Sequence, residues 1–410
     1  MTLADRTFQR ILLVKLSAVG DVVHTIPVLN ALRRRYPQAR IDWLLKPSVA
    51  SLVRAHPAVS NVLVYGENQT EVPRYNWDGV THFVGQLTDS VFLRLLRNLR
   101  AANYDLVVDM HGQMRTAFVT LVTGAPVRIG FDRPRRKVWE AYGKGLPEGT
   151  IGRAWKGARE GSWMAYTHHI GLETLDLHAV DRYQRVGRLL GFADAPPDFY
   201  FPVPPASIER LDALLESHGI AKPARPIVIS PTALWETKRW LPQHFAAVAR
   251  HFLAEGHNVV LIGSTVEQAE CRAIAEAAPG AIDLSGQTSL LELAALIGRS
   301  AVCLTNDSGP MHMAVALGQP VVSVFGPTHP VWVGPYRQSD AVLNAKLACS
   351  PCYVRPLSRC PHAHACMHQI TPDAVIARMS AKLAAGSVAP AVRPVVTTAG
   401  LVVPVGHELQ

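Results

Sequence analysis

A short apolar run, a tight turn and a helical stretch follow one another in both halves of this chain, and this pattern constrains the fold most. Near the N-terminus an apolar run at residues 11–16 is followed by S-A-V-G (17–20), a helical stretch that ends before Pro37, and a second apolar run at residues 41–45. Strand, turn, helix and strand in this order form a βαβ unit with a parallel sheet. The order restarts at residues 226–230, and further strands are expected at 258–263, 301–305 and 320–325. The sequence therefore predicts an α/β protein with two doubly wound, Rossmann-like domains that face one interdomain cleft.

Prolines cluster between residues 196 and 205, as in a linker. We therefore expect an N-terminal domain at residues 1–203 and a C-terminal domain at 204–370. Thr371, Pro372 and Asp373 supply an N-cap, a proline at the first helical position and an acid in the first turn, which predicts a helix at 371–386. Residues 387–410 are rich in Pro, Val and Ala without an amphipathic period, so a flexible tail is expected there.

The chain is basic, with 41 Lys plus Arg against 32 Asp plus Glu and a formal net charge of +9. An excess of this sign attracts anions such as phosphorylated sugars or lipid headgroups. Basic and aromatic residues are not interleaved in a way that favours nucleic acid. The sequence has neither the apolar core of a signal peptide nor an apolar stretch of about 20 residues. We expect a cytoplasmic protein that at most touches the inner membrane from its cytoplasmic face.

Asp21 ends the first strand–turn segment, at the carboxyl edge of the predicted parallel sheet. Open α/β sheets bind their ligands at this edge, so Asp21 is a candidate general base for a sugar hydroxyl. The alternative is that Asp21 only caps the following helix. His24, one turn later, either orients Asp21 or packs in the core, and packing is favoured.

A second candidate site is the segment T-N-D-S-G-P-M-H at residues 305–312. Backbone N–H groups of Ser308 and Gly309 at the start of a helix can bind a diphosphate without a metal. The alternative is a plain helix cap formed by Asp307 or Ser308, with His312 in the core. The three-glycine dinucleotide fingerprint is absent, which disfavours a dehydrogenase.

Two further side chains suit a nucleotide sugar. Lys238, in W-E-T-K-R-W at residues 235–240, can neutralise a departing diphosphate, and the alternative is a solvated basic loop. Glu267 follows the strand expected at 258–263 and can accept hydrogen bonds from ribose hydroxyls. Its alternative role is a first-turn acid that favours the helix dipole.

Four of the six cysteines (Cys349, Cys352, Cys360 and Cys366) lie within 18 residues of one another. In a reducing compartment such a group is typical of a metal site, and four thiolates suit structural zinc or iron. Free thiols in a surface loop are the alternative.

The blocks K-L-S-A-V-G-D-V-V-H-T-I-P (15–27), W-E-T-K-R-W (235–240), T-N-D-S-G-P-M-H (305–312) and F-G-P-T (325–328) together resemble glycosyltransferase family 9, the heptosyltransferases. The resemblance extends from about residue 9 to 385. It implies a GT-B architecture and the inverting transfer of heptose from ADP-heptose to the Kdo or heptose of the lipopolysaccharide inner core.

The resemblance also implies roles for individual residues. Asp21 would be the catalytic base, Lys238 would stabilise the leaving ADP, and no metal or other cofactor would be required for catalysis. The residues implied at the ADP-sugar donor are Thr232, Lys238, Glu267, Asp307, Ser308, Gly309 and His312.

A basic segment at residues 132–158 departs from the family pattern and looks like an enlarged loop on the acceptor side. Arg133, Arg136 and Lys137, together with Arg128 before them, are candidate contacts for a lipid-linked anionic glycan. A solvated insertion is the alternative. The cysteine block resembles part of the family that includes iron-carrying, protein-modifying heptosyltransferases.

Three other functions remain open at this point. A non-catalytic protein could use the same residues to bind a nucleotide and an anionic glycan. A protein-modifying heptosyltransferase or a nucleotide-sugar epimerase would share the two-domain architecture.

Overall fold

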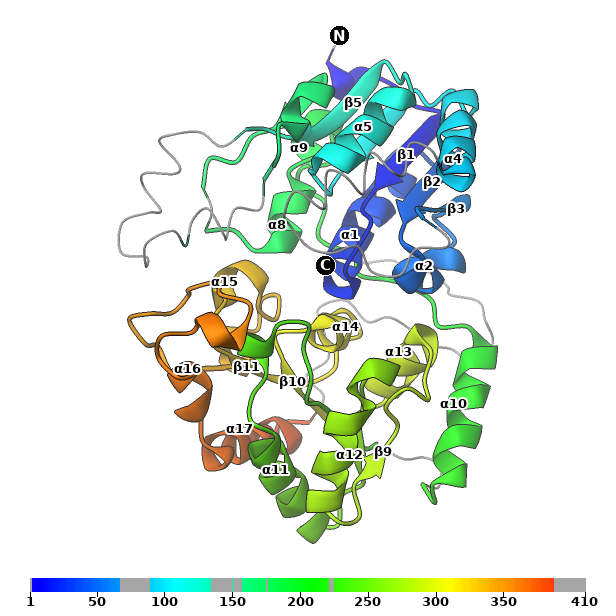
Figure 1. The fold of residues 1–410 in the computed structure, drawn as a ribbon. Coiled ribbons are helices and arrows are strands. Elements are labelled where there is room, and N and C mark those ends of the chain that lie inside the picture. Colours follow the sequence, from blue (N-terminus) through cyan, green and yellow to red (C-terminus); the bar gives the residue numbers. More distant parts are fainter. Residues whose placement is uncertain are drawn as a thin grey trace, which may run out of the picture. The chain divides into compact units, whose positions relative to one another are not determined.

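The computed structural model describes residues 2–66, 89–133, 150, 157–174, 176–220 and 225–386, and the chain forms two compact units (Figure 1). The first unit comprises Met1–Phe199 together with Gly326–Ser339 and Lys346–Arg355. The second comprises Tyr200–Phe325, Asp340–Ala345 and Pro356–Gln410. Each unit is built on its own six-stranded parallel sheet.

The first sheet has the strand order β3-β2-β1-β4-β5-β6. Its strands are β1 (Arg10–Val14), β2 (Arg40–Leu45), β3 (Asn61–Val64), β4 (Leu106–Asp109), β5 (Val127–Phe131) and β6 (His168–Ile170). The helices of this unit are α1 (Val19–Arg35), α2 (Pro47–Arg54), α4 (Ser90–Ala101), α5 (Met114–Val122), α8 (Ala179–Gln184), α9 (Gly187–Leu190) and α15 (Pro330–Val333). Helix α1 contacts α8, and α4 contacts α5.

The second sheet has the order β12-β11-β10-β7-β8-β9. Its strands are β7 (Ile227–Ser230), β8 (Val259–Leu261), β9 (Ile282–Asp283), β10 (Val302–Asn306), β11 (Val321–Phe325) and β12 (Val342–Asn344). The helices are α10 (Pro205–Ser217), α11 (Pro242–Ala254), α12 (Gln268–Ala277), α13 (Leu290–Gly298), α14 (Gly309–Ala316), α16 (Ala365–His368) and α17 (Pro372–Ala384). Helix α11 contacts α12 and α17, whereas α13 contacts α10 and α14.

Counted from its own first strand, each sheet has the order 3-2-1-4-5-6, which is the order of a dinucleotide-binding Rossmann fold. The prediction of an α/β protein with two doubly wound sheets is confirmed. Short 3₁₀ turns complete the described structure: η1 (Leu3–Asp5), η2 (Ser162–Ala165), η3 (Glu236–Lys238), η4 (Thr265–Glu267), η5 (Ser339–Ala341) and η6 (Leu357–Arg359).

Strand β1 shows why the sheets form from these sequences. Ile11, Leu12, Leu13 and Val14 are fully buried, and strand β7 is buried in the same way along its length. A strand in the middle of a parallel sheet has both faces covered by helices, so a continuous apolar run fits it better than an alternating one. The apolar runs of the sequence therefore lie at the centre of both sheets.

Helices α17 and α1 begin at capping and first-turn residues that the sequence shows. The hydroxyl of Thr371 accepts a hydrogen bond from the Ala374 N–H, and Pro372 occupies the first turn of α17. Helix α1 begins after Ala18, carries Asp21 in its first turn and has three arginines in its last turn, which suits the helix dipole at both ends.

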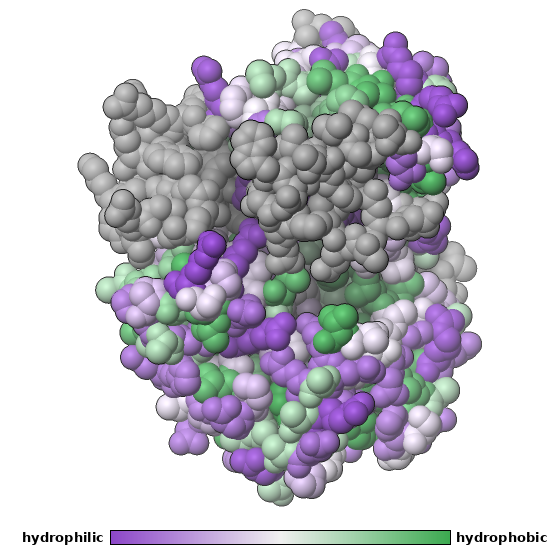
Figure 2. All heavy atoms as spheres, viewed as in Figure 1, coloured by the Kyte–Doolittle hydropathy of each residue, from purple (hydrophilic) through white to green (hydrophobic). Residues whose placement is uncertain are grey.

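The face of the second unit visible in Figure 2 is largely hydrophilic, with apolar residues scattered in small spots. Isolated apolar residues on a surface are ordinary for a folded domain. In the described ranges no helix combines the length and the apolar character needed to cross a membrane.

Candidate active site

The candidate side chains lie where the strand order of each sheet reverses. In the first unit β1 and β4 are neighbours whose connections leave in opposite directions, and in the second unit β7 and β10 are related in the same way. Open α/β sheets bind ligands in the crevice outside the carboxyl ends of such strands. The residues that follow these four strands therefore define a candidate site in each unit.

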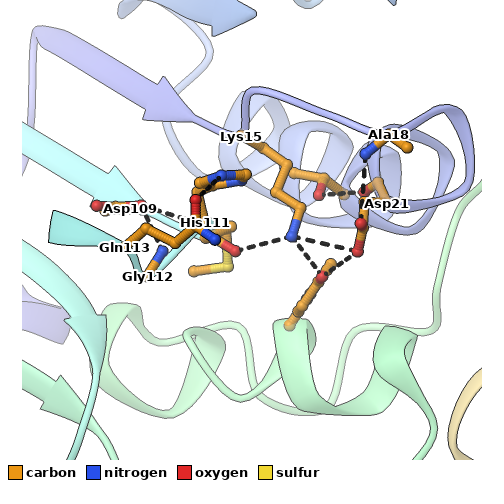
Figure 3. A network of polar contacts seen from close by, with 10 residues as sticks. Lys15, Ala18, Asp21, Asp109, His111, Gly112 and Gln113 are labelled. Carbon is orange, nitrogen blue, oxygen red and sulfur yellow. Dashed lines mark hydrogen bonds and ion pairs between the residues drawn. The ribbon is translucent and has the colours of Figure 1, made fainter. Parts of the chain in front are cut away.

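In the first unit Asp21 lies in the first turn of α1, and its side chain is 44% exposed. Its Oδ1 atom lies 3.2 Å from Nζ of Lys15 and accepts a hydrogen bond of 2.8 Å from the hydroxyl of Tyr183. Its Oδ2 atom accepts a longer bond of 3.3 Å from the Ala18 N–H (Figure 3). The carboxylate is thus both accessible and anchored.

Lys15 follows β1 directly, and only 6% of its side chain is exposed. Its ammonium lies 3.1 Å from the carbonyl oxygen of Met110 and 2.6 Å from the hydroxyl of Tyr183, in addition to Asp21. Burial is the largest single influence and opposes the charged form of Lys15, but the Asp21 carboxylate and the Tyr183 hydroxyl together outweigh it and hold the pKa of Lys15 above its usual value. A permanent cation therefore lies beneath Asp21.

The segment after β4 adjoins this ammonium, as Figure 3 shows. Asp109 is fully buried, and its Oδ1 accepts hydrogen bonds from the N–H groups of His111 and Gly112. Burial raises the pKa of Asp109 although these hydrogen bonds act the other way. The pKa of His111 is held well below its usual value by burial and then by the positive charges of Lys15 and Arg115, so the imidazole stays neutral.

In the second unit Asp307 follows β10 and is 5% exposed, whereas the Lys238 side chain is 16% exposed. The Lys238 ammonium lies 2.6 Å from Oδ2 of Asp307 and 4.4 Å from the ring centre of Trp235. Asn306, the last residue of β10, links this strand to the segment after β7. Its side-chain oxygen accepts a hydrogen bond from the Trp240 N–H, and its side-chain NH₂ donates one to the Pro231 carbonyl. The structure thus brings together Lys238 and Asp307, which the sequence placed 69 residues apart.

Helix α14 begins at Gly309, with Ser308 as its N-cap residue. No side-chain bond caps this helix, and the Ser308 hydroxyl is a buried oxygen without a hydrogen-bond partner among the described residues. His312 lies one turn into the helix and is buried. A helix N-terminus with an unsatisfied hydroxyl is suited to hold an anion.

Two predicted donor residues lie near other strand ends of the second sheet. Thr232 is buried just after β7. Glu267 follows β8 and accepts hydrogen bonds of 2.7 and 2.6 Å at Oε2 from the backbone and hydroxyl of Ser264. Through Oε2, Glu267 therefore completes a capping box with Ser264 at the start of η4.

The structure does not bring the predicted acceptor residues together in one described cluster. The Arg128 guanidinium donates to the backbone carbonyls of Ala125 and Ala165, and it stabilises the packing of β5. Arg133 is exposed after β5. Arg136 and Lys137 lie outside the described residues.

The metal site expected at Cys349, Cys352, Cys360 and Cys366 is not supported. These cysteines are half-buried and form no disulfide, and the described part of the chain contains no group of three or more His, Cys, Asp or Glu side chains placed to hold a metal ion. Cys349 and Cys352 belong to the first unit, whereas Cys360 and Cys366 belong to the second.

Sequence reasoning missed Lys15, Tyr183 and His111 as parts of the site. Lys15 carried a signal, because a lysine at the end of a continuous apolar run must be buried against a countercharge. Tyr183 had no such local signal, because it lies 162 residues from Asp21 and only the fold brings the two together.

Comparison with known proteins identifies the family. The sequence model of glycosyltransferase family 9 (heptosyltransferase) matches residues 92–147 and 146–362. Lipopolysaccharide heptosyltransferase 1 of Pseudomonas aeruginosa is 28% identical over 345 residues, which cover 84% of this chain and 86% of that protein.

Solved structures agree with this assignment. A family 9 glycosyltransferase of Veillonella parvula has a TM-score of 0.70 and 22% identity, covering 94% of this chain and 99% of that one. An Escherichia coli heptosyltransferase with ADP-2-deoxy-2-fluoro heptose has a TM-score of 0.62 and 21% identity, covering 91% and 99%. The two Rossmann-like units are therefore those of the GT-B fold, and this chain is a glycosyltransferase that belongs to family 9, the heptosyltransferases.

Proposed function

We propose that this glycosyltransferase moves heptose from ADP-heptose to the Kdo or heptose of the lipopolysaccharide inner core, with inversion at the anomeric carbon. Two observations support the substrates. The similar Pseudomonas protein is a lipopolysaccharide heptosyltransferase, and the similar E. coli structure holds an analogue of ADP-heptose. The basic character of the chain suits an anionic, lipid-linked acceptor at the cytoplasmic face of the inner membrane.

The observation that carries the proposed chemistry is the Asp21 carboxylate, accessible at the strand-order reversal of the first sheet yet anchored on a buried cation. In the proposed reaction the acceptor hydroxyl attacks the anomeric carbon from the side opposite ADP. A new glycosidic bond forms, the bond to ADP breaks, and the hydroxyl proton passes to Asp21.

The second unit supplies charge for the leaving group. As the bond to ADP breaks, negative charge develops on the diphosphate, and the Lys238 ammonium and the N–H groups at the start of α14 stabilise it. Asp307 holds the ammonium in place, and the Ser308 hydroxyl donates a further hydrogen bond. Thr232, His312 and Glu267 complete the donor contacts, with Glu267 at the ribose. In this mechanism protein cations and amides do the work of a metal, so none is required.

Arg133 and the neighbouring Arg136 and Lys137 are proposed to contact phosphate or carboxylate groups of the acceptor. Guanidinium and ammonium groups pair with such anions through charge-assisted hydrogen bonds. Arg128 is the weakest member of this set, because its guanidinium already bonds two backbone carbonyls.

The test is mass spectrometry of the products from ADP-heptose, with and without heptose-free lipopolysaccharide and in the presence of EDTA. We expect ADP and a singly heptosylated acceptor, at a rate that EDTA does not change. Free or epimerised sugar released without acceptor would instead support an epimerase. Heptose attached to a protein in place of the glycan, or donor binding without transfer, would also overturn the proposal.

A further inference from the structure

Asp21 lies on a helix start, where its side chain alone has several open rotamers, and a base must hold one orientation. The carboxylate is restrained at Oδ1, which is 3.2 Å from the Lys15 ammonium and 2.8 Å from the Tyr183 hydroxyl. Two donors that converge on one carboxylate oxygen restrict both the rotation and the tilt of the group. The restraint therefore comes from outside helix α1.

The hydrogen bonds of this cluster are complete. An ammonium has three donors, and Lys15 directs them to Asp21, the Met110 carbonyl and the Tyr183 hydroxyl. Because the Tyr183 hydroxyl accepts from Lys15, its own proton is available for Asp21. Burial raises the pKa of Tyr183 to about 12, so the phenol keeps that proton throughout the neutral range.

Three separate elements build the cluster. Lys15 follows β1, Met110 follows β4, and Tyr183 belongs to α8, which contacts α1. The Lys15 ammonium also lies 4.7 Å from the Tyr183 ring centre. Burying a lysine without a countercharge is costly, so a cation in this place indicates that Asp21 is held ionised.

We infer that Lys15 and Tyr183 are positioning residues, which keep the Asp21 carboxylate ionised and direct its Oδ2 toward the acceptor hydroxyl. The inference rests on the proposed function of Asp21 as the base. Since Oδ1 already accepts two strong hydrogen bonds, the proton of the acceptor is taken up at Oδ2, the atom 3.3 Å from the Ala18 nitrogen.

The charged and titratable groups around Asp21 include Lys15 after β1, His111 after β4, and Arg182 and Tyr183 on α8. His111 is neutral and Tyr183 stays protonated, whereas Arg182 contributes a buried positive charge. Lys15 is a cation in direct contact with the carboxylate. Its removal should change the protonation of the base more than any other single substitution.

The test compares Lys15→Met and Tyr183→Phe with the unmodified enzyme in pH profiles of kcat/KM for heptose transfer. Loss of the neighbouring cation raises the pKa of a carboxylate, so Lys15→Met should move the acidic limb of the profile upward by about one to three pH units. Tyr183→Phe removes one hydrogen bond to a charged group and should lower kcat by about 10- to 100-fold. Tyr183→Phe should also move the acidic limb of the kcat/KM profile to higher pH, by less than Lys15→Met does.

Tyr104→Phe is the matched control. Tyr104 is also buried in the first unit, and its hydroxyl donates 2.7 Å to the buried carboxylate of Asp42, which pairs with Arg40. Tyr104→Phe should lose about as much stability as Tyr183→Phe. The acidic limb of its kcat/KM profile should stay at the pH of the unmodified enzyme. A merely structural role of Tyr183 would give both tyrosine variants the same unshifted profile and would overturn the inference.

Asp21→Asn separates failure of this inference from failure of the proposed function. If Asp21→Asn kept most of its turnover, the base would be wrongly assigned and the proposed function would fail with it. If Asp21→Asn were inactive while folded Lys15→Met and Tyr183→Phe retained the unmodified acidic limb, only the positioning roles would be overturned. Should Lys15→Met not fold, Tyr183→Phe, which removes a single oxygen, decides the question.

Discussion

Each unit carries a lysine–aspartate pair where its strand order reverses, but the two pairs expose opposite charges. In the first unit the Lys15 side chain is 6% exposed and that of Asp21 is 44% exposed. In the second unit the Asp307 side chain is 5% exposed and that of Lys238 is 16% exposed. The same chemical pair at the same place in the same fold thus leaves the carboxylate more exposed in one unit and the ammonium more exposed in the other.

The position of each residue relative to its strand explains the reversal. Lys15 and Asp307 directly follow the central strands β1 and β10, where the backbone is still covered by both layers of helices. Asp21 and Lys238 lie farther along, in a helix start and in a short 3₁₀ turn. In each pair the member at the strand end is the more buried one, and its partner is the more exposed one.

The largest effect is expected from Asp21→Asn, which removes the exposed charge of the first unit and keeps its shape. Loss of a general base lowers kcat by about 10²- to 10⁴-fold. The measurement is ADP release from ADP-heptose with acceptor present, alongside circular dichroism to show that the fold is intact. A folded variant with near-normal turnover would reduce Asp21 to a helix cap and break the comparison.

Lys238→Met tests the exposed cation of the second unit. Removal of one electrostatic contact to the leaving group should lower kcat by about 10²- to 10³-fold. Arg239→Met is the control, because Arg239 is the adjacent cation but bonds to Glu270 and the Ala233 carbonyl. We expect the control to stay within a few-fold of the unmodified enzyme in the same assay. Equal losses in both variants would indicate that only overall charge matters.

The sequence was informative where a candidate residue lies in the turn or helix start that follows an apolar run. Asp21 and Asp307 could be predicted because turns after central strands of a parallel sheet meet at one edge. Both βαβ patterns and helix α17 could be predicted for a similar reason, since their signals are local. Strands β6, β9 and β12, with three, two and three residues, carry too little pattern to be recognised alone.

Contacts between distant segments could not be predicted. Gly326–Ser339 packs with the first unit although it lies in the sequence between β11 and β12 of the second. The Tyr336 hydroxyl donates a hydrogen bond of 2.7 Å to Asp181, and the His178 ring bonds the Gly334 carbonyl. The same limit applies to Tyr183 beneath Asp21. The metal site predicted from the spacing of four cysteines is likewise not supported by the described residues.

Asp109 is a buried carboxylate that contrasts with the accessible carboxylate of Asp21. Like Asp21 it accepts a tyrosine hydroxyl, in this case Tyr166 at 2.9 Å, but it is fully buried and bonds neutral donors. A Cβ atom at Gly130 would lie 2.3 Å from the Tyr166 ring, so the absence of a side chain there lets the tyrosine reach Asp109. We therefore expect a substitution that disturbs Asp109 to lower the free energy of unfolding more than it lowers kcat.

Gly130→Ala should destabilise the first unit by about 1–3 kcal/mol, as overpacking does in a buried site. The matched control is Gly171→Ala, since a Cβ atom at Gly171 would meet nothing within 4 Å. Urea unfolding measures both, and the control should change little. At temperatures where Gly130→Ala is folded, its kcat should stay within a few-fold of normal. A loss as large as that of Asp21→Asn would mean that Asp109 takes part in the chemistry.

The smallest effect concerns His111 and reports on the buried cation of the first unit. Since burial and the charges of Lys15 and Arg115 lower the pKa of His111, the native protein binds fewer protons there than the unfolded chain does. Stability must then fall as the pH drops below about 6.5, the ordinary histidine pKa, by at most about 1.4 kcal/mol per pH unit. His111→Asn removes this dependence. The difference in unfolding free energy between the unmodified enzyme and His111→Asn should therefore shrink or change sign between about pH 8 and about pH 5.5. A difference that stays constant over this range would show that His111 titrates normally, and the ammonium beneath Asp21 would then not exert the field that the comparison of the two pairs requires.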